Sequence, residues 1–197
     1  MNHLAHFLLS EQDSALLVGG LLGDFVKGRL KGQFSPGIEN GIRLHRAIDA
    51  FTDRHPIVRT SCKRPVPRFR RVAPIMTDIF YDYFLAKHWT QFHGASLEGF
   101  SKRITRTILD YDIELPAGPR RFVTYLAETR SLEGYRDTAF IERSFLHLNK
   151  RLTRDNPLDV AYSQFAENES GLESDFFAFF PELQQFTYAW IDSNHSL

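Results

Sequence analysis

Cysteine is almost absent from this chain of 197 residues, and net charge is absent altogether. The one cysteine, Cys62, has no partner for an intrachain disulfide, which excludes the framework of a small disulfide-stapled secreted protein. The 24 basic residues are balanced by 24 acidic ones, so no global field favours nucleic acid or a membrane surface. An electrostatic partner would have to be met by a local patch.

Long apolar runs are also lacking. No stretch approaches the roughly 20 apolar residues of a membrane span. The first residues, MNHLAHFLLSEQDS, carry no basic region, and His3 and His6 interrupt their apolar part, so they do not read as a signal peptide. We therefore expect a cytoplasmic protein that does not associate with a membrane.

The chain does contain helix-forming sequence, divided by breakers. Gly, Ser and Pro predict loops at residues 28–37 and 115–119, and His55-Pro56 predicts a turn. No segment alternates apolar and polar residues in the way that strands joined by hairpins do. We predict an all-α, single-domain helical bundle over residues 1–197, with helices near residues 2–9, 13–27, 38–53, 74–89, 97–109, 122–129, 138–152 and 158–180 or beyond.

Polar residues stand in apolar surroundings in the first half of the chain. His45 and Asp49 are four residues apart, as are Asp78 and Asp82, so each pair projects from one helix face. Asp24 follows the apolar run Leu21-Leu22-Gly23. Burial of a carboxylate is costly unless it is compensated, and a metal ion compensates it well.

Imidazole and carboxylate ligands suit Mn²⁺, Mg²⁺ or Fe²⁺, and the lack of cysteine ligands argues against structural zinc. Other interpretations stay open at this point. A lone Asp on a helix is usually solvated or capping, and His45 with Asp49 is also the pattern of a surface pair. His88, beside Trp89, fits core packing as well as function.

Several ordered motifs resemble one family, that of the acyl carrier protein phosphodiesterases. The resemblance runs over nearly the whole chain and is densest from residue 2 to residue 89. The motifs are Asn2-x-Leu4-Ala5-His6, Gly20-x-Leu22-x-Asp24-Phe25-Val26-x-Gly28, Gly41-Ile42-x-x-His45-Arg46-x-Ile48-Asp49, Thr52-Asp53 with Pro56, Arg71-Val72-Ala73-Pro74-Ile75 with Asp78, Asp82, Phe84-Leu85 and Trp89, and Tyr135-Arg136-Asp137 with Phe140-Ile141.

The resemblance implies Mn²⁺-assisted hydrolysis of holo-carrier protein to apo-protein and 4′-phosphopantetheine, by a divergent relative of the HD phosphohydrolases with a distorted HD-like fold. HD enzymes carry an adjacent His-Asp pair, which this sequence lacks, so their ligand set is not transferred. The metal ligands we expect are His6, Asp24, His45 and Asp78. Asp49 or Asp82 is expected as a further ligand or as the base that orients water. Arg46 either contacts the phosphate or is solvated.

The segment KRPVPRFRR is the one strongly basic stretch. Its cations are Lys63, Arg64, Arg68, Arg70 and Arg71, and its prolines predict an extended, exposed conformation. The resemblance implies an acidic carrier protein as partner, which this patch suits, although an ordinary solvated loop is the alternative. A nucleic-acid partner is not expected, because the patch is short and no nucleic-acid motif accompanies it.

Two competing functions remain on the sequence alone. One is an HD-like phosphohydrolase acting on a nucleotide, which shares the metal site but needs no docking surface. The other is a non-catalytic helical binding module, which needs neither metal nor turnover. The oligomeric state is not predicted by any feature of the sequence.

Overall fold

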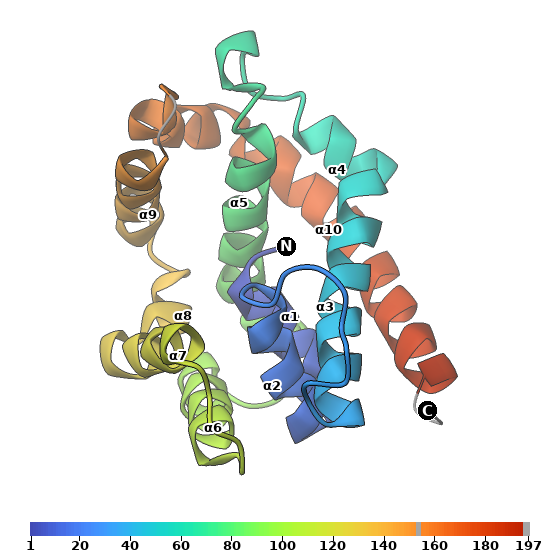
Figure 1. Cartoon of the computed structure of the whole chain (residues 1–197). Coiled ribbons are helices and arrows are strands. Elements are labelled where there is room, and N and C mark those ends of the chain that lie inside the picture. The colour runs from blue at the N-terminus through green and yellow to red at the C-terminus, as the bar shows by residue number, and fades with distance from the viewer. Residues whose placement is uncertain (153–154, 195–197) are drawn as a thin grey trace.

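The computed structural model describes residues 1–152 and 155–194, and within them every regular element is helical (Figure 1). The prediction of an all-α fold is confirmed. Its likeness to the HD fold stays a prediction. In chain order the elements are α1 (His3–Ser10), α2 (Ser14–Gly23), α3 (Pro36–Arg54), α4 (Pro56–Ser61), η1 (Pro67–Phe69), α5 (Ala73–Lys87), η2 (Trp89–Gln91), α6 (Leu97–Asp110), α7 (Ala117–Thr129), α8 (Ser131–Gly134), α9 (Thr138–Arg151), η3 (Leu158–Val160) and α10 (Ala161–Asn194).

Helix starts follow the capping residues of the sequence. The Asp13 side chain accepts hydrogen bonds from the amides of Ala15 and Leu16 at the start of α2, and the Asn2 side chain accepts one from His3 at α1. These acceptors satisfy amides that have no partner within the helix. Prolines stand in the first turns of α3, α4 and α5, where a missing N–H costs nothing.

Several predicted boundaries were wrong. Helix α2 ends at Gly23 rather than near residue 27, and α7 begins at Ala117 because Pro119 is tolerated in a first turn. His55 is extended, as the residue before proline should be, but helix resumes at once as α4. The short α8 was not predicted at all.

Glycines bring α2 and α3 into backbone contact. A Cβ placed on Gly19 would lie 2.6 Å from the Cα of Gly41, and one on Gly41 would lie 2.5 Å from the carbonyl oxygen of Leu16. Any larger residue would push the helices apart. The crossing therefore fixes the register of α3, which carries His45, against the end of α2, which Asp24 follows directly.

Helices α5 and α10 supply much of the aromatic core. Phe176 and Phe179 of α10 pack against Tyr81 of α5, and all three side chains are buried. Helix α10 crosses behind α3, α4 and α5, and α1 begins near the centre of the opposite face (Figure 1). Within residues 1–152 and 155–194, no helix has the length and apolar character needed to cross a membrane.

Candidate metal centre

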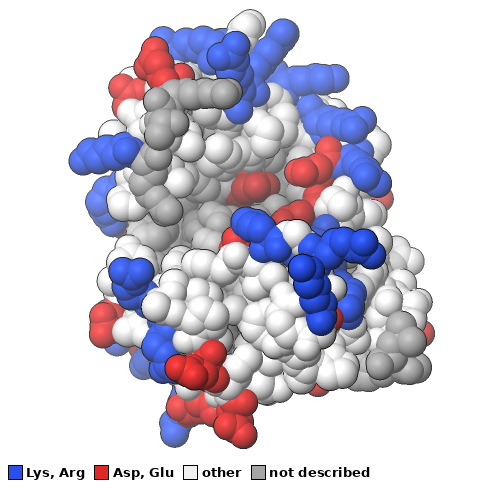
Figure 2. Space-filling model, viewed as in Figure 1, with Lys and Arg blue, Asp and Glu red and all other residues white. Residues whose placement is uncertain are grey.

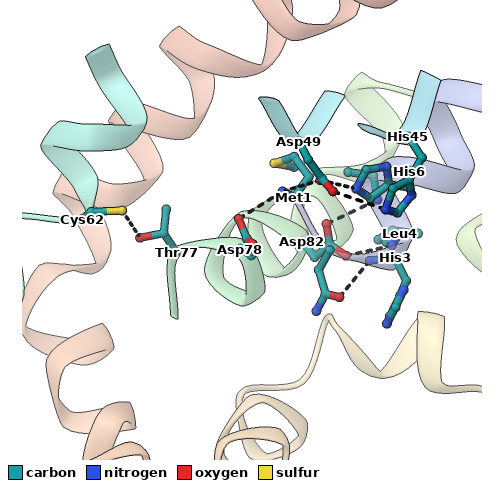
Figure 3. A network of polar contacts seen from close by, with 12 residues as sticks. Met1, His3, Leu4, His6, His45, Asp49, Cys62, Thr77, Asp78 and Asp82 are labelled. Atoms are coloured by element: carbon teal, nitrogen blue, oxygen red, sulfur yellow. Dashed lines mark hydrogen bonds and ion pairs between the residues drawn. The ribbon is translucent and has the colours of Figure 1, made fainter. Parts of the chain in front are cut away.

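Two histidines and one aspartate converge where α1 meets α3 (Figure 3). Nε2 of His6 lies 3.0 Å from Oδ1 of Asp49, and Nε2 of His45 lies 3.3 Å from Oδ2 of the same carboxylate. One ligand atom from each of the three residues falls within 4.8 Å of the others. These are donor types that bind borderline and hard divalent metals.

The imidazoles are held rigidly by packing. Both side chains are only 5% exposed, and their rings stack with centroids 4.0 Å apart. The His45 ring also lies against Gly23, where an added Cβ would approach its Cγ to 2.3 Å. The Nδ1 atoms of both rings are buried without a hydrogen-bond partner in the described chain, so the polar function of each ring is directed through Nε2.

Electrostatics favour a charged Asp49 beside an uncharged His6. Burial acts to raise the pKa of Asp49, but hydrogen bonds from His45 and His6 outweigh it, and the pKa falls well below its ordinary value. Burial, reinforced by the neighbouring His45 ring, lowers the pKa of His6 to about 4. Near neutral pH the cluster thus has one carboxylate and, at His6, a neutral imidazole, which is the form that binds metal.

Asp24 lies at the exposed edge of the cluster. Its Oδ1 is 3.6 Å from Nε2 of His45, and its Oδ2 is 3.4 Å from Nδ1 of His3. Burial opposes ionisation, but His3 and then His45 hold the pKa of Asp24 below its ordinary value. Asp24 is therefore beside the three converging ligands while also orienting a histidine that the sequence analysis did not single out.

Asp78 faces the cluster through the α-amino group of Met1. That nitrogen is 3.1 Å from Oδ1 of Asp78 and 3.9 Å from Oδ1 of Asp49, so the two carboxylates share a positive neighbour (Figure 3). Burial lowers the pKa of the amino group, but Asp78 and Asp49 outweigh this and raise it. Asp78 is thus near Asp49 but outside the triad of converging ligand atoms.

Asp82 has a different environment from the other acids. It has no exposed surface, and its oxygens accept backbone hydrogen bonds from Leu4 at 2.8 Å and Ala5 at 3.3 Å. Burial raises the pKa of Asp82 to about 7, although both amides act to lower it. A side chain expected to be a ligand or a base therefore closes the first turn of α1 and anchors the helix that carries His6.

Of the arginine and lysine side chains predicted to contact substrate or partner, some have a partner within the chain and others are exposed without one among the described residues. Arg46 donates to the backbone oxygen of Val26 at 2.8 Å and so fastens the loop after α2 to α3. Arg64 makes a two-point ion pair with Asp175 of α10, so its charge is compensated within the chain. Lys63, Arg68, Arg70 and Arg71 are exposed and form no ion pair within the described residues.

The basic segment (residues 63–71) is also less extended than predicted. Residues Pro67–Phe69 form a turn of 3-10 helix, and the Phe69 side chain is buried against the core. The correction has a simple physical cause, since an aromatic side chain gains by leaving water even in an otherwise polar segment. His88, for its part, lies 2.6 Å from Glu173 on α10, away from the converging ligands.

The cluster opens onto a hollow in one face of the molecule. Figure 2 shows acidic side chains in this hollow, near the point where Figure 1 places the N-terminus, with basic side chains around it. The carboxylates of Asp24, Asp49 and Asp78 are each about 40% exposed, at 42%, 43% and 36%. A separate cavity of about 640 Å³ is lined by Leu8, Phe92 and Tyr188 and by none of the converging ligands.

Comparison with known proteins now adds to this geometry. A sequence profile described as "Acyl carrier protein phosphodiesterase" matches residues 1–183. The chain belongs to the acyl carrier protein phosphodiesterase family. The prediction of this family, and with it the prediction of an enzyme of the hydrolase class, is confirmed.

Curated relatives agree with the profile. The chain is 36% identical over 189 residues to an acyl carrier protein phosphodiesterase of Serratia proteamaculans, covering 94% of this chain and 96% of the relative. A protein of the same name from Klebsiella pneumoniae is 35% identical over 189 residues, covering 94% and 96%. One from Salmonella newport is 35% identical over 190 residues, covering 93% and 95%. No solved structure matches the chain.

Family members are thus similar along their whole length, but the particular roles of His3 and of the Met1 amino group come from the structure. The sequence signal for His3 was its position three residues before His6, which places both on one side of a helix. No comparable signal points to the contact of Met1 with Asp78, because the contact joins residues far apart in the chain.

The lowered pKa of His6 predicts a pH dependence of stability in metal-free protein. Between pH 6.5 and about 4 the unfolded chain protonates this histidine while the folded chain does not. The free energy of unfolding should therefore fall as pH falls through this window, by roughly 3 kcal/mol from this group.

Urea unfolding with chelator present should show this pH dependence of the free energy of unfolding in the parent and a weaker one in His6→Gln. Replacement of the exposed His147 by Gln is the control and should keep the parent's slope; equal slopes in all three proteins would contradict the assignment.

Proposed function

We propose that this protein is a cytoplasmic, metal-dependent phosphodiesterase that hydrolyses a holo-acyl carrier protein to the apo-protein and 4′-phosphopantetheine. The observation that carries the proposal is the convergence of His6, His45 and Asp49, next to carboxylates that are about 40% exposed. Membership of the family supplies the substrate class. The chemistry of the donors supplies the dependence on metal.

The donor set fits a divalent ion of the Mn²⁺ class, with Mg²⁺ and Fe²⁺ as alternatives. His6 and His45 offer imidazole nitrogens and Asp49 a carboxylate, and Asp24 stands next to them as a fourth donor. Asp78 adds negative charge nearby, and the site already attracts one cation, the Met1 ammonium group. A divalent metal in such a site lowers the pKa of its water and polarises the phosphoryl oxygen.

The residues of the chain perform the remaining tasks. In the metal-free chain Asp49 orients both imidazoles by accepting hydrogen bonds from Nε2, and each ring would carry its proton on Nδ1 instead in order to bind a metal through Nε2. Asp82 positions His6 by anchoring the first turn of α1. During hydrolysis a water oxygen bonds to phosphorus and releases a proton to solvent, the bond from phosphorus to the serine oxygen of the carrier protein breaks, and that oxygen takes up a proton. We place His3 as the proton donor, because Asp24 engages its Nδ1 and leaves Nε2 without a partner among the described residues.

The substrate must bring its phosphodiester into the hollow, so a carrier protein has to lie across the rim. The free cations of the basic segment (residues 63–71) provide one contact surface. Cys62, directly before this segment, has its Sγ 3.5 Å from Oγ1 of Thr77, the neighbour of Asp78, so the segment begins close to the site. Exposed charge pairs are each worth about 0.2–1 kcal/mol, so their main effect is on encounter and orientation.

The function is tested directly by intact mass measurement. Metal-stripped protein should leave holo-carrier protein unchanged in excess chelator, and added Mn²⁺ should restore conversion to apo-carrier with release of phosphopantetheine. The reason is that a lost ion removes both water activation and phosphate polarisation. Full conversion in chelator would overturn the metal dependence.

The same assay separates the competing functions. An HD-like phosphohydrolase would release phosphate or pyrophosphate from nucleotides and would leave holo-carrier intact. A non-catalytic helical module would bind the carrier without converting it in any metal. The hollow is open and has basic side chains around it, which suits a protein substrate better than the enclosed pocket expected for a small ligand.

A further inference from the structure

We infer that the loop joining α2 to α3 (residues 24–35, the α2–α3 loop) is a second docking surface for the acidic carrier protein. The inference rests on the proposed function. Lys27, Arg29 and Lys31 are all exposed on this loop and form no ion pair or side-chain hydrogen bond within the described residues. Residues 25–35 carry these three cations and no acidic residue, so on a neutral chain they form a local positive patch that would attract an acidic partner.

The loop is held in place rather than free. The Arg46 side chain donates to the oxygen of Val26, and the Glu39 carboxylate accepts from the amide of Gly32 at 2.9 Å. Val26, Leu30 and Phe34 are partly buried against the core, so the loop has an apolar underside and a charged outer side. A surface that is ordered before binding loses less entropy when a partner docks.

The position of the loop connects it to the chemistry. It begins at Asp24, which lies 3.6 Å from His45, and the first of its cations is three residues further on. Basic side chains gather in Figure 2 where Figure 1 draws this loop across the front of the molecule. Others gather at the top, where Figure 1 draws the chain between α4 and α5, and the acidic hollow lies between the two groups.

This arrangement specifies the partner. Nucleic acid would place phosphates all along its path, including over the carboxylates of the hollow, where they would be repelled. A small acidic domain instead presents negative charge to both edges and inserts a single phosphodiester between them. The charge pattern therefore fits an acidic protein that carries one phosphate group at its centre of contact.

The test neutralises the loop in the full-length protein. The variant Lys27→Gln, Arg29→Gln, Lys31→Gln is compared with Lys102→Gln, Arg106→Gln, Arg130→Gln, which removes equal charge around α6 from side chains already paired to Glu98 or Asp110. The loop variant should raise KM for holo-carrier roughly tenfold, about 1.4 kcal/mol, with most of the loss on KM rather than kcat. The control variant should match the parent, and the difference between the two variants should shrink as salt rises.

A binding measurement with apo-carrier protein makes the result independent of turnover. The loop variant should bind it roughly tenfold more weakly than the control variant at low salt. A matching variant of the basic segment, Arg68→Gln, Arg70→Gln, Arg71→Gln, should add its own loss to that of the loop if one carrier contacts both edges.

The outcomes are distinguishable. If the parent cleaves holo-carrier but the loop variant binds apo-carrier as well as the parent does, the docking surface is overturned and the proposed function stands. If the parent neither binds nor cleaves the carrier, both proposals are overturned. Weakened binding of a single-stranded RNA probe, with carrier binding unaffected, would assign the loop to nucleic acid instead and also overturn the inference.

Discussion

Replacement of Asp49 by alanine is expected to lower turnover of holo-carrier protein by at least a thousandfold, while the fold persists. This carboxylate contacts both buried imidazoles, through Oδ1 to His6 and Oδ2 to His45. Its loss removes one proposed ligand and the orientation of two others. A thousandfold loss is about 4 kcal/mol of barrier, a size that the removal of metal-assisted water activation supplies and a surface ion pair does not.

The measurement pairs single-turnover kinetics with Mn²⁺ titration by calorimetry. Asp53→Ala is the matched control, because Asp53 lies one helical turn further along α3, is exposed and forms no ion pair within the described residues. Its kinetics and Mn²⁺ affinity should equal those of the parent. If Asp49→Ala has native circular dichroism and its turnover falls less than about tenfold, Asp49 is not part of the site.

His45→Ala tests the same centre without altering its negative charge. If Asp49 acted only by attracting cations, the histidine variant would retain most of its affinity for Mn²⁺. A donor set that binds through imidazole nitrogen predicts instead that both variants lose affinity together. If only Asp49→Ala lost affinity for Mn²⁺, the ion would be bound by general electrostatic attraction rather than through imidazole nitrogen.

Local spacing was enough to predict part of this site. The separation of four residues between His45 and Asp49 placed both side chains on one face of α3, and they do contact each other. The same rule applied to Asp78 and Asp82 predicted a shared helix face but not the different environments of the two carboxylates. Asp78 contacts the α-amino group of Met1 and is partly exposed, whereas Asp82 lies beneath α1 and caps its first turn.

The difference between those two carboxylates depends on long-range packing. No pattern within α5 shows that the amides of Leu4 and Ala5 approach one end of Asp82, because α1 reaches it from more than seventy residues away. The pairing of Arg64 with Asp175 was hidden for the same reason. Helix type followed from local periodicity and breakers, while the partner of each charge followed from the tertiary arrangement.

Glycine at position 23 has a role that periodicity likewise conceals. The sequence pattern gave it no role, because the helix was predicted to continue past it to residue 27, whereas it is the last residue of α2. In the structure the His45 ring rests against it, and the lack of side chains at Gly19 and Gly41 allows α2 and α3 to approach closely enough for this contact. The absence of a side chain at this point determines where a proposed ligand lies.

Gly23→Ala is accordingly expected to damage the metal site although it changes no polar atom. The new Cβ would lie 2.3 Å from Cγ and 2.6 Å from Cδ2 of His45, so the ring must move. Alanine gains at most about 1 kcal/mol of helix propensity, against about 1–3 kcal/mol for overpacking a buried contact. We expect a net loss of stability and a fall of roughly 10- to 100-fold in Mn²⁺ affinity, the size seen when the groups that orient a ligand are lost.

Gly94→Ala is the control, because a Cβ there meets nothing within 4 Å. Thermal unfolding and Mn²⁺ calorimetry of both variants decide the matter: if Gly23→Ala binds Mn²⁺ as tightly as Gly94→Ala does, the position of the His45 ring is not what the site requires, and the ion is held by other side chains.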